Sequence, residues 1–124
     1  MSETSELVID IVTMARENDQ FREVIWTGEE AQLVLMAIPE GGEIGGETHE
    51  GHDQLLYFVA GEGKAKIGDE EMDVKDGSVA IVPSGKFHNF TNTGSGMLKL
   101  YTTYSPPEHE AGTEHDTKAE ADAA

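Results

Sequence analysis

Two glycine-punctuated stretches constrain this chain of 124 residues more than any other feature of its sequence. The stretches run from Gly41 to Gly61 and from Gly77 to Asn92. Each predicts a strand, a turn marked by glycine or proline, and a returning strand. Each also carries histidine near its turn, beside a carboxylate or an amide. Side chains of these kinds can form one metal site if both stretches line the interior of a small β-barrel.

The phase of the strands selects the candidate ligands. Side chains two residues apart in a strand point to the same face, so Glu47 and His49 are expected to project together. Gln54 begins the returning strand, and His88 lies in the second stretch. Two imidazoles, a carboxylate and an amide oxygen suit Zn, Fe, Mn, Ni or Cu, and also match the facial triad that leaves positions open. A register slip of one residue would replace Gln54 by Asp53.

The spacing of both stretches resembles the two sequence motifs of the cupin superfamily. The second motif is complete, with its conserved positions occupied by Gly77, Pro83, Gly85, His88 and Asn92. The first motif keeps its spacing, with its positions occupied by Gly41, Glu47, His49, Gln54 and Gly61. The resemblance covers about residues 28–105. The pattern is also similar to small stand-alone cupins, some of them called mannose-6-phosphate isomerase-like.

Two residue types depart from the first cupin motif. Glu47 stands where the family has its first histidine, and Gln54 stands where the family has glutamate. The set of candidate ligands therefore still has one carboxylate, at position 47 instead of position 54, which favours a retained metal site. The resemblance implies a divalent ion, Zn, Fe, Mn or Ni, held by Glu47, His49, Gln54 and His88. If Glu47 is not a ligand, it could serve as a general base.

The predicted fold is all-β, a cupin double-stranded jelly-roll β-barrel over residues 21–105. Residues 1–20 form an N-terminal extension, in which Leu7 to Asn18 has both strand-like and helical features and favours a short helix around 10–17. No helix is expected after residue 20. Residues 106–124 are expected to form an acidic, flexible tail, which could still fold over the barrel mouth. His109 and His115 lie in this tail and are not expected to form a second metal site.

Composition excludes several classes of protein. The chain has 25 acidic against 8 basic residues and a formal net charge of −17, which opposes contacts with nucleic-acid phosphates. It has no cysteine for disulfides or thiolate ligands, and no apolar run of about 20 residues to span a membrane. The acidic start lacks the features of a signal peptide, so a cytoplasmic location is expected. The dispersed acidity indicates a halophilic, salt-adapted source, with an ordinary acidic protein as the alternative.

These features predict a small-molecule partner. The leading hypothesis is a metal-dependent enzyme of isomerase or dioxygenase type acting on a small organic substrate. The alternatives are a non-catalytic cupin that binds a sugar or metabolite, and a structural cupin without metal. The net charge and the scarcity of arginine, which occurs only as Arg16 and Arg22, argue against an anionic or phosphorylated substrate. The resemblance also implies a homodimer with a contribution from residues 21–27, whereas His52 is expected to face solvent.

Overall fold

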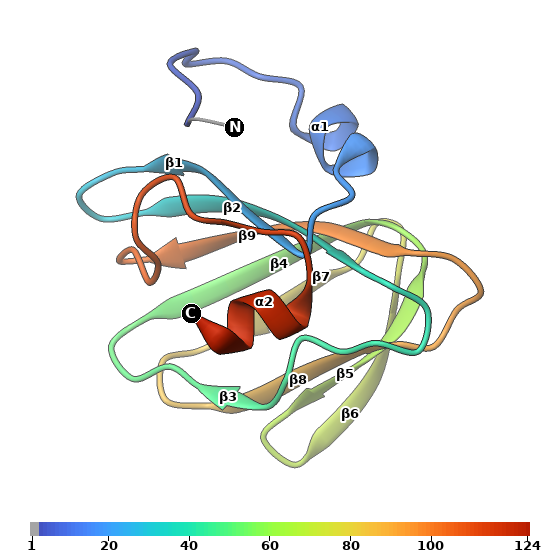
Figure 1. Cartoon of the computed structure of the whole chain (residues 1–124). Helices are drawn as coiled ribbons and strands as arrows, with labels where there is room; N and C mark the ends of the chain where they lie inside the picture. Colours follow the sequence, from blue (N-terminus) through green and yellow to red (C-terminus); the bar gives the residue numbers. More distant parts are fainter. Residues whose placement is uncertain (1–2) are drawn as a thin grey trace.

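Two antiparallel β-sheets face each other across one hydrophobic core in the computed structural model, which describes residues 3–124 (Figure 1). The elements in chain order are α1 (Ile11–Glu17), β1 (Arg22–Thr27), β2 (Gln32–Ile38), β3 (Glu47–Thr48), β4 (Asp53–Ala60), β5 (Glu62–Ile67), β6 (Glu70–Lys75), β7 (Val79–Val82), β8 (Phe87–Asn92), β9 (Leu98–Ser105), β10 (Glu114–His115) and α2 (Lys118–Ala123).

The strand order identifies the fold as a jelly roll. The larger sheet has the order β10-β1-β2-β9-β4-β7, and the smaller sheet has the order β3-β8-β5-β6. The chain crosses between the sheets from β3 to β4 and again from β7 to β8, so the two glycine-punctuated stretches each contribute to both sheets. The predicted all-β cupin barrel is therefore confirmed. The strand expected over 44–49 is shorter than predicted, with regular pairing only at Glu47–Thr48.

Alternating burial along the strands places the core between the sheets. In β9 every second residue is buried, which is the pattern of a strand with one face toward the interior. Phe58 and Phe90 are fully buried with their ring centroids 5.8 Å apart. Burying each such ring contributes about 1.5–3 kcal/mol. Both rings are therefore part of the barrel core.

The predicted N-terminal helix is present as α1. Asp10 caps the helix, since its side chain accepts a hydrogen bond from the Thr13 amide at 3.2 Å. The apolar residues of α1 pack on the outer face of the larger sheet, where Ala15 is fully buried with Ile25 and Leu35. This tertiary packing explains why the helical pattern prevails over the strand-like residues. Within residues 3–124, neither helix has the length and apolar character needed to span a membrane.

The C-terminal residues differ from the sequence-based prediction. Residues 114–115 form β10, which pairs with β1, and residues 118–123 form α2, so the expectation of no helix after residue 20 was wrong. Thr117 caps α2 by accepting from the Glu120 amide at 3.1 Å, and Ala121 packs against the core between the sheets. In Figure 1 the red tail runs along β1 and places α2 over one end of the barrel. We call this end the mouth.

Candidate metal centre

Three of the predicted ligands meet at the mouth of the barrel. Glu47 on β3 lies directly opposite His88 on β8 in the strand register. His49 follows β3 and projects from the same face as Glu47, as the two-residue phase predicted. Ligand atoms of these three side chains lie within 4.8 Å of one another. The His49 Nε2 atom donates to Glu47 Oε2 at 2.7 Å, and the two imidazole centroids are 5.2 Å apart.

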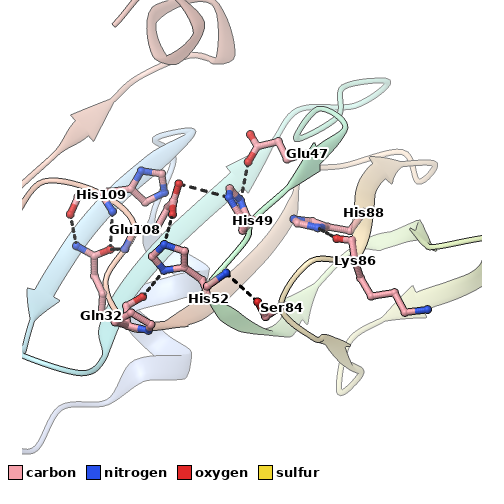
Figure 2. A network of polar contacts seen from close by, with 11 residues as sticks. Gln32, Glu47, His49, His52, Ser84, Lys86, His88, Glu108 and His109 are labelled. Atoms are coloured by element: carbon pink, nitrogen blue, oxygen red, sulfur yellow. Dashed lines mark hydrogen bonds and ion pairs between the residues drawn. The ribbon is translucent and has the colours of Figure 1, made fainter.

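Both histidines are held from behind through their Nδ1 atoms. His88 Nδ1 donates to the carbonyl oxygen of Lys86 at 3.1 Å. His49 Nδ1 lies 3.4 Å from Glu108 Oε1, a carboxylate that the tail supplies (Figure 2). Such contacts fix the orientation of a ligating imidazole, so that its Nε2 atom can coordinate a metal ion. Both rings are therefore oriented for coordination at one point.

Gln54 contributes a buried oxygen without a partner. Its side chain is 3% exposed, and its Nε2 atom donates to Thr102 Oγ1 at 3.1 Å. The Thr102 hydroxyl in turn donates to the Leu55 carbonyl oxygen at 2.8 Å, so the Thr102 oxygen acts as the acceptor for the Gln54 amide. This leaves Gln54 Oε1 buried with no hydrogen-bond partner within residues 3–124. An unpaired buried polar atom of this kind costs about 1–3 kcal/mol, which a metal–oxygen contact would remove.

The neighbouring Asp53 is excluded from the cluster. Its side chain lies on the opposite, exposed face of β4 and accepts from the Ser84 amide at 2.9 Å. The register that turns Gln54 inward is therefore the one found, and Asp53 instead bonds a neighbouring turn. Two imidazoles and one carboxylate form a donor set that fits a borderline divalent ion.

The protonation states also suit a metal. The hydrogen bond from His49 holds the pKa of Glu47 below its usual value, and the same bond raises the pKa of His49. Burial lowers the pKa of His88, so this ring stays neutral at neutral pH. A carboxylate and a neutral imidazole are the forms in which these groups bind metal ions. A bound cation would displace the proton that His49 shares with Glu47.

The tail is bound to the mouth by side chains that the sequence did not single out. His52 was predicted to face solvent, but its Nδ1 and Nε2 atoms lie 2.7 Å from the Pro106 carbonyl oxygen and 2.9 Å from Glu108 Oε2. Gln32 holds the backbone of residues 108 and 109. Its Oε1 accepts from the amides of Glu108 and His109, and its Nε2 donates to the His109 carbonyl oxygen. Figure 2 shows these contacts together. Glu108 consequently connects His52 with the candidate ligand His49.

A cavity of about 500 Å³ lies between the cluster and the tail. Glu47 and His49 line it from the barrel, and His109 and His115 line it from the tail. Arg22 also lines it, because Arg22 is in phase with the core residue Val24 on β1 and so points inward. Sequence reasoning missed Arg22, although its two-residue spacing from the apolar positions of β1 carried the signal.

The fold and this mouth define a double-stranded β-barrel protein with a candidate metal site at one end. The chain belongs to the cupin family, since the cupin domain profile matches residues 34–104. It is 42% identical over 123 residues to the uncharacterised protein YrkC of Bacillus subtilis, which covers 94% of this chain. The chain spans 66% of the length of that relative.

Two further comparisons concern structure and ligand binding. A Bacillus halodurans protein of known crystal structure superposes with a TM-score of 0.97 and 37% identity over 100% of both chains. An oxalate-binding protein of Thermotoga maritima is 33% identical over 65 residues, which are 52% of this chain and 54% of that protein. The crystal structure of a predicted oxalate decarboxylase from the same organism matches with a TM-score of 0.66 and 25% identity over 69% of this chain and 79% of that one.

Proposed function

We propose that this cupin binds one divalent metal ion, Zn, Fe, Mn or Ni, through Glu47, His49, Gln54 and His88. In this proposal the ion is the centre of an enzyme active site for a small organic substrate. The buried Oε1 atom of Gln54 carries the proposal, because this amide oxygen accepts no hydrogen bond from the described residues. The contacts behind His49 and His88 support it.

The cavity residues have distinct tasks in this site. The ion would polarise a carbonyl or hydroxyl oxygen of the substrate, or provide open positions for dioxygen, which are the needs of an isomerase or a dioxygenase. Glu47 has the most exposed side chain of the candidate ligands with printed values, at 38% against 12% for His49. It can therefore turn from the ion and accept a substrate proton at Oε2. The tail covers the mouth and limits the access of water to the bound molecule.

A second candidate function is binding without chemistry. The name of the Thermotoga maritima relative, an oxalate-binding protein, favours this alternative. A binder would gain thermal stability from its ligand and leave the ligand unchanged, whereas an enzyme would convert it. Incubation of the metal-loaded protein with panels of hydroxy acids, oxo acids and sugars, analysed for products and for unfolding temperature, separates the two functions.

Elemental mass spectrometry of the untagged protein tests the metal site. The wild type should hold close to one ion per chain after reconstitution with each candidate metal, and the variant with His49→Ala and His88→Ala together should hold none. His109→Gln is the matched control, since it removes an imidazole that lines the same cavity but is not in the proposed ligand set. The proposal fails if the wild type takes up none of the four metals, or if the double variant keeps the ion.

A further inference from the structure

The cavity at the mouth contains one cationic side chain among the described residues that line it. This residue is Arg22, which is 8% exposed. Most of the acidic groups on the same cavity have partners of their own. Glu47 pairs with His49, and Glu108 contacts both His49 and His52. Asp122 pairs with Lys118 at 2.6 Å, and Glu110 lies exposed at the rim.

Arg22 itself has no such partner. Its Nε atom is buried without a hydrogen bond, and no carboxylate of residues 3–124 forms an ion pair with it. Its guanidinium carbon lies 5.3 Å from the centre of the Phe21 ring, which supports the side chain from one side. A buried guanidinium without a carboxylate is costly. Arg22 is close enough to Glu47 to help lower the pKa of that carboxyl, but the described residues form no ion pair with its guanidinium, which is therefore available to a partner from outside the chain.

Two imidazoles of the tail present further unpaired nitrogens at the same cavity. His115 is the strand partner of Arg22 across β10 and β1, and its Nδ1 atom is buried without a hydrogen bond. The Nε2 atom of His109 is also buried and unpaired. The His109 ring packs edge-on against Tyr104 at 5.1 Å, while Gln32 holds the His109 backbone. These contacts fix both histidines on the cavity wall before any ligand arrives.

We propose that Arg22, His109 and His115 form a carboxylate-binding subsite in the cavity that the candidate metal ligands Glu47 and His49 also line. This inference rests on the proposed function, in which the ion binds one oxygen-bearing end of the substrate. The subsite then binds a carboxylate at the other end, since the guanidinium fork matches a carboxylate and the imidazoles add N–H donors. The ligand class is a compact dicarboxylic, hydroxy or oxo acid. The charge of Arg22 overrides locally the acidity of the chain as a whole.

Titration calorimetry with oxalate, malonate, succinate and glutarate tests this subsite on the metal-loaded protein, with acetate as the ligand that has one carboxylate. The dicarboxylate that fits best should bind Arg22→Gln about 10- to 100-fold more weakly than it binds the wild type, as expected for the loss of a charged hydrogen bond. Acetate, which needs only the ion, should bind both proteins alike. Arg16→Gln, which removes the exposed arginine of α1, is the matched control and should change neither affinity.

Equal dicarboxylate affinity in Arg22→Gln and the wild type would overturn the proposal, as would equal losses for acetate and the dicarboxylate. If Arg22→Gln does not fold, Arg22→Lys and His115→Gln replace it. Each should lower dicarboxylate affinity several-fold, and unchanged affinity in both would overturn the proposal. If the wild type binds no metal, the proposed function fails by itself. The subsite is then tested on the metal-free protein, where succinate should raise the unfolding temperature of the wild type but not of the variants.

Discussion

The mouth and the base of the barrel interior use the same strands and the same inward-facing positions but have opposite chemistry. On β8, His88 lies at the mouth and Phe90 lies two residues deeper. On β4, Gln54 lies at the mouth and Phe58 lies deeper. Gln54 and Phe58 are almost equally buried, at 3% and 2% exposure. Burial therefore does not distinguish the two ends.

The difference lies in how the buried atoms are satisfied. At the base, apolar side chains are in contact on all sides, as in the tilted pair of Phe58 and Phe90. At the mouth, the Gln54 amide nitrogen donates to Thr102, and the amide oxygen of the same side chain is left without a partner among the described residues. The base supplies stability, and the mouth retains polar atoms that a ligand can use. Substitutions at the two ends should have correspondingly different consequences.

The largest effect on folding is expected from Phe58→Ala at the base. Loss of a fully buried ring and the cavity left behind should lower the free energy of unfolding by about 3–5 kcal/mol. The metal content of the folded protein should not change. Urea denaturation followed by intrinsic fluorescence measures the loss, with Phe87→Ala, at a 43% exposed ring, as a control that should cost much less. A small loss for Phe58→Ala would show that the base is not the main source of stability.

Glu108→Gln should have the next largest effect, and this effect should appear in metal affinity. The substitution weakens the contact that orients His49 from behind, and loss of such supporting contacts typically costs about 10- to 100-fold in affinity. Competition with a chelator of known affinity measures the change. Glu110→Gln removes the same charge from a neighbouring, exposed position and should leave the affinity unchanged. Equal metal affinities for Glu108→Gln and the wild type would show that the tail does not support the metal site.

A smaller, pH-dependent effect is expected at His109. Burial lowers the pKa of His109 from 6.5 to about 4 in the folded protein. The unfolded chain therefore binds this proton at a higher pH than the folded chain, and the resulting penalty on stability grows as pH falls from 6.5 to about 4. His109→Gln lacks this penalty. Its unfolding temperature should rise relative to the wild type as pH is lowered, in thermal scans from neutral pH to about pH 4. A difference that does not change with pH would contradict the prediction.

The smallest effect on folding is expected from Gln54→Leu at the mouth. The substitution removes the orphaned Oε1 together with one hydrogen bond, and these changes offset each other to within about 1 kcal/mol. Metal occupancy should fall nevertheless, because one oxygen donor is lost. Gln54→Glu keeps an oxygen donor and should retain the ion. A large loss of stability in metal-free Gln54→Leu would mean that the mouth is packed in the same way as the base.

Most of the barrel could be predicted because its strands alternate between two environments. In β8 and β9 every second residue is buried, so alternation along the sequence defines an inward face, whereas β2 is a continuous apolar run that is buried along nearly its whole length. The same alternation placed Glu47 beside His49. The six-residue gap between Gln54 and Gly61, which matches the first cupin motif, selected Gln54 over Asp53, since a slip of one residue would turn every side chain of the strand to the other face.

The tail and its contributions to the mouth could not be predicted in this way. Gln32 and His109 are 77 residues apart in sequence, and their contact uses the backbone of the tail, which leaves no apolar pattern to detect. Glu108 resembles any other residue of an acidic tail until the fold brings it to His49 and His52. The role of Arg22 likewise depends on which carboxylates lie near it in space.

The way in which Gln32 holds the tail has a consequence for how this protein could diversify. At residues 108 and 109 the amide of Gln32 contacts main-chain atoms only, so this part of the attachment does not depend on which side chains occupy those positions. Those side chains nevertheless face the cavity. Substitutions at 108 and 109 can therefore change ligand preference without dismantling the attachment. Selection can therefore alter specificity through these two tail positions at little cost to the stability of the barrel.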